Sequence, residues 1–171
     1  MGLIMLQLKD LPNTEILSKF AERYSDADIH KVLQFLTVLR IGSDLSLMLD
    51  NFLAGYGLLQ GRWWVLILLM READLTTTPS ILASKAGVSR ATMTGLLDGL
   101  EREGLVSRVT DKRDRRRLAI QLTSAGQAKL DQVMPAYYQR VNALMDSLSS
   151  TEAEELIQSL KSLHSQQTVF E

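Results

Sequence analysis

The stretch PSILASKAGVSR, residues 79–90, carries the strongest structural signal in the chain. Pro79 suits the first turn of a helix that Thr78 can cap, because proline has no N–H to leave unpaired there. Gly87 permits the left-handed backbone of a tight turn, and Ser89 is a favourable cap for a second helix. The stretch therefore predicts a helix-turn-helix. The apolar residues expected inside its first helix are Ile81, Leu82 and Ala86.

The second helix of this motif is predicted over residues 89–103. Its apolar residues recur every three or four positions and should face the core; they are Met93, Leu96, Leu97 and Leu100. The outer face near its N-terminus is small and polar, which lets a helix backbone lie deep in a DNA major groove about 12 Å wide. The residues expected to contact DNA from this helix are Ser89, Arg90, Ala91, Thr92 and Thr94. The alternative interpretation is that these side chains are merely exposed to solvent on the outer face of the helix.

Two alternating runs follow, residues 105–109 and 118–122, and they predict antiparallel strands. Residues 110–117 between them hold five cations and two acids. In an arbitrary protein a charged run of this kind is as often a solvated loop as a binding site. Placed at a hairpin tip behind a helix-turn-helix, it predicts a wing that contacts DNA.

The flanking sequence reads as helix. Helices are expected from Asn13 or Thr14 to Tyr24, from a start near Ser25 to the glycines at 55 and 57, and over residues 61–72. A long helix capped by Thr123 or Ser124 should continue past Pro135 with a kink, and a capping box at residues 151–154 should open the last helix. A short strand is expected at residues 76–78. The fold class is thus mainly α with a small β wing.

Composition excludes several chemistries. The chain has 171 residues, no cysteine and two histidines. Disulfides, thiolate metal sites and cysteine nucleophiles are excluded, and neither a metal site nor a cofactor is expected. No Ser-His-Asp set, glycine-rich phosphate loop or pair of catalytic acids can be assembled, so we expect no enzyme. The longest uninterrupted apolar run, residues 63–70, is far short of the roughly 20 residues that span a bilayer. We expect a cytoplasmic protein without a membrane partner.

The net charge of −1 conceals an uneven distribution. Residues 76–123 hold nine lysines and arginines against five acids, a net charge of +4, so the remainder carries −5. The middle of the chain is therefore the part suited to bind an anion.

The sequence resembles the multiple antibiotic resistance regulator (MarR) family of dimeric winged helix-turn-helix regulators. The resemblance covers roughly residues 28–164 and rests on the order and spacing of short motifs. These motifs are GL at 57–58, WWVL at 63–66, LA at 82–83, GVS at 87–89, LEREGLV at 100–106, DKRDRR at 111–116, LT at 122–123 and Gly126.

The resemblance implies a homodimer on double-stranded DNA. Residues 1–56 and 124–171 would supply the dimerisation helices, and residues 57–123 would form the winged helix-turn-helix lobe. By position in the wing, Asp114 would brace Arg116 in the minor groove, with Arg113 and Arg115 nearer the phosphates.

Family effectors commonly settle beside the dimerisation helices, which suggests a small aromatic or anionic ligand here. The candidate residues offer cations and apolar walls; they are His30, Arg40, Arg62, Trp63 and Trp64. Each has an ordinary alternative, since an aromatic residue on an apolar helix is more often core and a charged one is more often solvated or paired.

Two functions from different classes remain open at this point. The leading hypothesis is a ligand-responsive repressor that binds an inverted repeat as a homodimer. The alternative is a winged-helix protein-interaction module without specific DNA binding, against which the +4 lobe and the intact wing motif argue.

Overall fold

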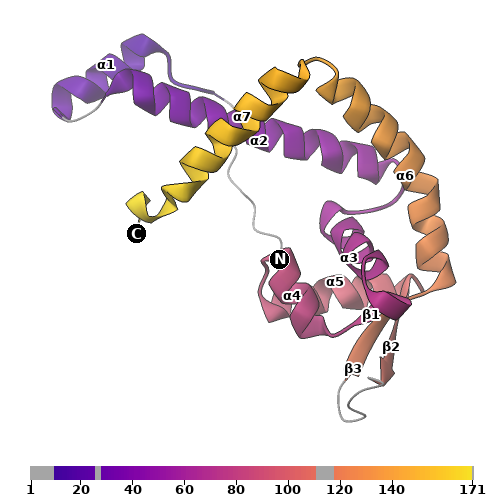
Figure 1. Cartoon of the computed structure of the whole chain (residues 1–171). Helices are drawn as coiled ribbons and strands as arrows, with labels where there is room; N and C mark the ends of the chain where they lie inside the picture. Colours follow the sequence, from indigo (N-terminus) through magenta and orange to yellow (C-terminus); the bar gives the residue numbers. More distant parts are fainter. Residues whose placement is uncertain (1–9, 26–27, 111–117, 171) are drawn as a thin grey trace. The chain divides into compact units, whose positions relative to one another are not determined.

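The computed structural model describes residues 10–25, 28–110 and 118–170 (Figure 1). The chain divides into two compact units, residues 1–63 and 64–171. The boundary falls within one helix, α3 (Gln60–Met70). The predicted assignment of residues 1–56 and 124–171 to dimerisation concerns assembly and stays a prediction.

The first unit holds α1 (Thr14–Arg23) and α2 (Ile29–Ala54). Asn13 caps α1 by accepting a hydrogen bond from the Ile16 amide at 2.9 Å. Asp28 caps α2 by accepting one from the Lys31 amide at 3.1 Å, so the predicted start near Ser25 was early. Hydrogen bonds from the Lys31 backbone and side chain hold the pKa of Asp28 below its usual range. Both helices thus begin at a side chain that accepts from an otherwise unpaired amide.

The second unit contains the predicted helix-turn-helix. The remainder of α3 leads through the short 3-10 turn η1 (Ala73–Leu75) into β1 (Thr76–Thr77), α4 (Pro79–Ala86) and α5 (Arg90–Arg102). Thr78 caps α4, Pro79 occupies its first turn, and Gly87 adopts φ 64° and ψ 31° after its end. The Val88 amide donates to the Ala83 carbonyl at 3.1 Å across this left-handed residue. The predicted cap, turn and second cap are all confirmed.

The wing strands are β2 (Val106–Thr110) and β3 (Leu118–Leu122). They pair antiparallel from Val106 opposite Leu122 to Thr110 opposite Leu118. The short strand β1 adds to the other edge of β3, so the strand order is β1-β3-β2. The structure confirms a mainly α fold with a small β sheet.

The core of the second unit joins helices to the sheet. Its largest fully buried side chains come from α3, α4, α5, β3 and α6 (Ser124–Met145); they include Leu66, Leu69, Leu82, Met93, Leu97, Leu100, Ile120 and Val133. Ile81 departs from expectation because its side chain is 43% exposed, while Ala83 takes the buried place beside Leu82. Leu96 is only half-buried. Gly99 is buried as well, so the buried face of α5 is shifted from Leu96 toward Gly99 relative to the prediction.

The C-terminal helices are α6 and α7 (Ser150–Ser165), followed by the short turn η2 (Gln167–Phe170). Thr123 caps α6, which runs unbroken through Pro135. The capping box of α7 is formed by Ser149 and Glu152, two residues before the predicted box at 151–154. Hydrogen bonds from Ser149 lower the pKa of Glu152. Both boxes carry the same spacing of hydroxyl and carboxylate, and the helix begins at the earlier one.

Candidate nucleic-acid interface

The N-terminal turn of α5 is organised by its cap. Ser89 Oγ accepts a hydrogen bond from the Thr92 amide at 3.1 Å and lies 2.9 Å from the Thr92 hydroxyl. Thr94 Oγ1 donates to the Arg90 carbonyl at 2.9 Å. The first turn of a helix presents partly positive amides, so this end is suited to approach a DNA backbone.

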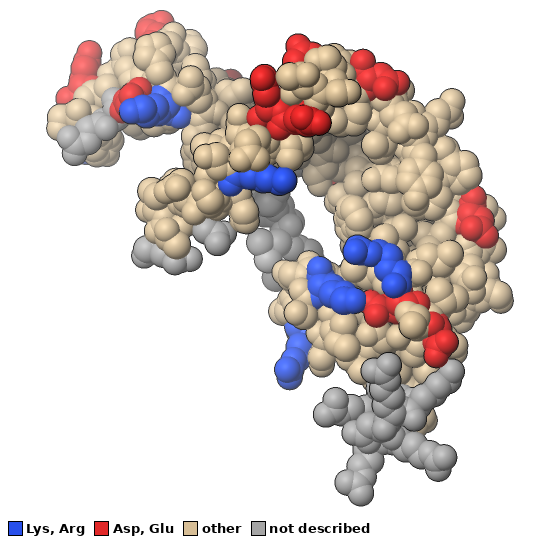
Figure 2. Space-filling view, in the orientation of Figure 1, with Lys and Arg blue, Asp and Glu red and all other residues tan. Residues whose placement is uncertain are grey.

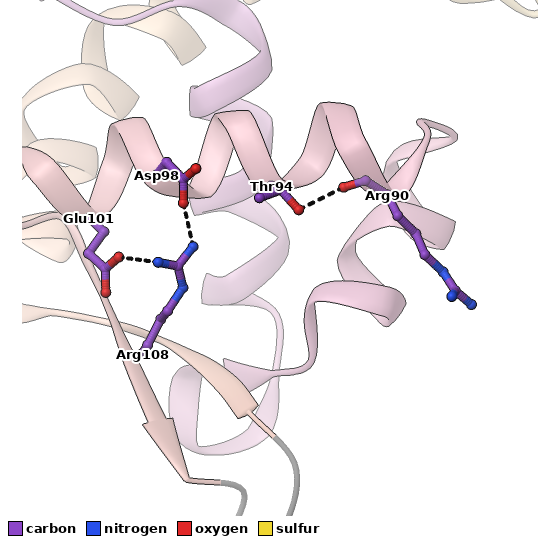
Figure 3. A network of polar contacts seen from close by, with 5 residues as sticks. All are labelled: Arg90, Thr94, Asp98, Glu101 and Arg108. Atoms are coloured by element: carbon purple, nitrogen blue, oxygen red, sulfur yellow. Dashed lines mark hydrogen bonds and ion pairs between the residues drawn. The ribbon is translucent and has the colours of Figure 1, made fainter.

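The structure exposes every residue that the sequence assigns to this contact. The residues predicted to contact DNA from α5 are all exposed: Ser89, Arg90, Ala91, Thr92 and Thr94. Met93, which lies between Thr92 and Thr94, is buried against the core, and so is Leu97 in the next turn. In Figure 3 the Arg90 side chain extends from the first turn of α5 away from the rest of the helix. One helix thus has an anchored face and a free face, as a recognition helix requires.

Further along α5 the same side of the helix is occupied by an ion-pair cluster (Figure 3). Arg108 of β2 donates from Nη2 to Asp98 Oδ1 at 2.5 Å and from Nη1 to Glu101 Oε2 at 2.6 Å. The hydrogen bond to Asp98 and the charge of Glu101 raise the pKa of Arg108. The sequence alone predicted no role for these three residues. The available signal for this cluster was a pair of acids three positions apart on a helix, followed by an arginine on the next strand.

A second ion pair joins α4 to the residue that precedes η1. Lys85 near the end of α4 binds the Glu72 carboxylate, which precedes η1. Figure 2 shows lysine and arginine side chains beside carboxylates over the lobe at the bottom of the view. On the described part of this face, cations therefore stand next to acids rather than in one continuous patch.

The positive charge of the lobe is concentrated at the predicted wing tip. Residues 111–117 carry five cations and two acids, which is +3 of the net +4. The other residues of the lobe, 76–110 and 118–123, carry four cations and three acids, which is +1. The predicted contacts Arg113, Asp114, Arg115 and Arg116 lie outside the described residues. Thr110 and Leu118, which flank that segment, are paired across the sheet.

The predicted effector residues are spread along α2 and α3. His30 is exposed in the first turn of α2, and Arg40 lies ten residues later, roughly 15 Å along the helix axis. Arg40 Nε donates to Asp44 Oδ2 at 2.7 Å. On α3, Arg62 is half-buried, Trp63 is 1% exposed and Trp64 is 43% exposed. His30 and Arg40 therefore do not face one small ligand from adjacent positions on α2.

Titratable residues do not gather into a metal site in the described part of the chain. No group of three or more histidines and acids with suitable placement occurs among residues 10–25, 28–110 and 118–170.

Comparison with known proteins places these features in a family. A model of the MarR family matches residues 60–118, from the start of α3 to the start of β3. The HTH-type transcriptional repressor YetL of Bacillus subtilis is 34% identical over 165 residues, which cover 96% of this chain and 99% of YetL.

The chain belongs to the MarR family. It is thus a winged helix-turn-helix transcription regulator, as the sequence predicted. Two solved structures share its fold, and the first of them is described as a MarR family transcriptional regulator. The DNA complex of Sco3205 from Streptomyces coelicolor has a TM-score of 0.73 at 20% identity, covering 81% of this chain and 88% of Sco3205. CouR from Rhodococcus jostii RHA1, bound to p-coumaroyl-CoA, has a TM-score of 0.65 at 25% identity, covering 81% of this chain and 92% of CouR.

Proposed function

We propose that this MarR-family chain is a repressor that binds an inverted repeat in double-stranded DNA as a homodimer. The observation that carries the proposal is the exposed N-terminal face of α5, in one lobe with two paired strands that flank residues 111–117, a segment whose sequence has a net charge of +3. Two such helices related by a two-fold axis read two half-sites about 10 base pairs apart. YetL is named a transcriptional repressor, which supports repression rather than activation by this chain.

The wing completes the contact in this proposal. Arg116 enters the minor groove and Asp114 braces it, while Arg113 and Arg115 neutralise phosphates. The family resemblance supports these roles, and the charge distribution supports the segment as the main source of electrostatic attraction.

The apolar surface of the long helices supports the homodimer. α2 has 26 residues with a mean hydropathy of 1.5 over its most apolar window, enough in length and composition to cross a membrane. YetL aligns with 96% of this chain, which includes this helix. We therefore assign the exposed apolar residues of α2, such as Phe35, Leu39 and Met48, to packing against a second copy rather than lipid. α6 and α7 expose Leu144, Leu156 and Leu163 in the same way; these belong to the same interface in our proposal.

We also propose a small anionic aromatic effector that releases the operator. CouR, which shares the fold, was solved with p-coumaroyl-CoA. Of the predicted residues on α2 and α3, Trp64 and His30 are exposed and Arg40 and Arg62 are half-buried, so each has surface to offer such a ligand, whereas Trp63 is buried. We assign the chain no catalytic activity and a cytoplasmic location, in keeping with its regulator relatives.

The experiment that tests the function starts from operator selection. Bound sequences are selected from a random duplex pool, and the stoichiometry on the winning site is measured by analytical ultracentrifugation. We expect an inverted repeat with half-site centres about 10 base pairs apart, two chains per site, and affinity that falls steeply with salt. A monomer that binds an isolated half-site with full affinity would contradict the dimer, and no salt-dependent duplex binding would favour the protein-interaction module.

A further inference from the structure

One stripe of α5 changes its chemical character halfway along the helix. Arg90, Thr94, Asp98 and Glu101 follow one another at four- and three-residue spacing, so they share one side of the helix. The N-terminal pair offers a cation and a hydroxyl-bearing side chain. The C-terminal pair offers two carboxylates, which DNA phosphates repel.

Arg108 covers the acidic half of this stripe from the wing strand. Two different guanidinium nitrogens bind two different carboxylates, at 2.5 Å to Asp98 and 2.6 Å to Glu101. The guanidinium is planar and its donors are fixed in direction, so two simultaneous bonds hold the side chain in one orientation. The Arg108 side chain is 33% exposed, and both carboxylates are partly exposed. The cluster is therefore a surface clamp between α5 and β2.

The clamp joins α5 to the paired strands of the sheet. Arg108 pairs with Ile120 of β3 in the sheet register, and Ile120 is fully buried. The Arg108 side chain thus ties α5 to β2, and the partner strand β3 is anchored in the core by Ile120. Thr110, two residues further on, is the last residue of β2 before the segment 111–117.

We propose that Arg108 is a positioning residue that neutralises Asp98 and Glu101, sets the angle between the recognition helix and the wing, and ends the DNA-reading face of α5 after Thr94. Arg108 binds carboxylates and not a DNA phosphate. This inference rests on the proposed DNA-binding function, because a boundary of the reading face has meaning only on DNA.

The test is a rescue experiment on the selected operator. Arg108→Ala exposes two unpaired carboxylates and releases the strand, and we expect operator affinity to fall by about tenfold or more. Adding Asp98→Asn and Glu101→Gln to Arg108→Ala removes the repulsion, so the triple variant should regain a substantial part of that loss. The charge-matched control is Arg102→Ala, an exposed arginine in the last turn of the same helix, which should change affinity by less than threefold.

The salt dependence of binding separates positioning from direct contact. If Arg108 bound a phosphate, Arg108→Ala would lower the salt slope by about one ion per subunit, and the triple variant would bind no better. That result, or an unchanged affinity of Arg108→Ala, overturns the proposal. Arg108→Lys keeps the charge but lacks the two-pronged geometry, so we expect an affinity between those of wild type and Arg108→Ala.

Hydrogen exchange on the free protein tests the clamp independently of DNA. Arg108→Ala should speed exchange of the Val109 and Thr110 amides relative to wild type, while amides of α4 stay unchanged and report an intact fold. Unchanged exchange in β2 would overturn the positioning role. If wild type selected no duplex at all, the proposed function would fail while the exchange result still decided whether Arg108 positions the wing strand.

Discussion

At the scale of single residues, the hydrogen bonds of α5 determine what each exposed side chain can offer to a base. Thr94 donates its hydroxyl hydrogen to the Arg90 carbonyl at 2.9 Å, so that hydrogen is already used inside the helix. The side chain then presents its methyl group and an oxygen lone pair outward. A thymine methyl in the major groove is the natural partner of an outward methyl group.

Thr94 should therefore read thymine through its methyl group. Thr94→Ser deletes that methyl and should cost about 0.8 kcal/mol at each half-site, which is roughly fourfold in affinity per half-site and roughly 15-fold for a dimer on both. Thr94→Val keeps the methyl and should bind within about twofold of wild type. Fluorescence anisotropy with thymine or uracil at each operator position measures this, because only the wild type and Thr94→Val should lose affinity with uracil. A loss of affinity in Thr94→Val together with none in Thr94→Ser would mean that the hydroxyl reads the base.

At the scale of elements, the first turn of α6 joins the wing at a point of close backbone approach. A Cβ atom on Gly126 would lie 2.2 Å from the Leu105 carbonyl oxygen. Thr123 donates its amide to the same carbonyl at 3.2 Å and its hydroxyl to the Gly104 carbonyl at 2.7 Å. Gly104 follows Glu103, the residue that caps the C-terminus of α5. The recognition helix, the start of β2 and α6 are thus held together by backbone groups, which have little freedom to adjust.

Gly126→Ala should separate these elements and destabilise the fold. Overpacking against a backbone atom costs about 1–3 kcal/mol, and for a chain of this size 2 kcal/mol lowers Tm by roughly 4–8 °C. The matched control is Gly95→Ala in α5, where an added Cβ would meet no atom within 4 Å. This control should be neutral or stabilising by up to about 1 kcal/mol, since alanine favours helix. Thermal unfolding followed by circular dichroism compares them, and equal Tm values for the two variants would refute the close approach.

At the scale of the whole molecule, control by a ligand depends on the link between the equilibrium of ligand binding and that of operator binding. An effector releases the operator only if it binds the DNA-incompetent form of the dimer more tightly than the competent one. A tenfold loss of operator affinity requires about 1.4 kcal/mol of coupling. Trp64 is 43% exposed and Trp63 is buried, so Trp64 is the better reporter of a ligand that binds beside α3.

Aromatic carboxylic acids should quench tryptophan fluorescence and release the operator over the same concentration range. Arg40→Ala should weaken both effects if Arg40 exchanges Asp44 for the ligand carboxylate, whereas Trp64→Phe should remove most of the fluorescence change and keep operator release. Parallel titrations of fluorescence and anisotropy measure the two signals. If no compound in a broad panel changes either one, the regulator is a constitutive binder controlled by its own abundance.

Local chemistry made the lobe predictable from its sequence. Thr78, Pro79, Gly87 and Ser89 each act on the backbone within a few residues, so their order was enough to place the helix-turn-helix. The alternating strands and the cap at Thr123 were found in the same way. Where two capping signals lay close together, the prediction from sequence was wrong. Asp28 caps α2 and Ser149 caps α7, although Ser25 and Thr151 fit the capping pattern as well.

The sequence by itself determined the fold class, the family and the exposed face of the recognition helix, because these follow from periodicity, caps and turns over short distances. Only the tertiary structure decided that Arg108 binds Asp98 and Glu101, and that Gly126 is needed beside Leu105. Both contacts join residues from elements that meet only after the strands have paired and α6 has packed on them. A pattern along the sequence does not tell how far apart such elements lie in the fold, so these contacts could be found only from the packed structure.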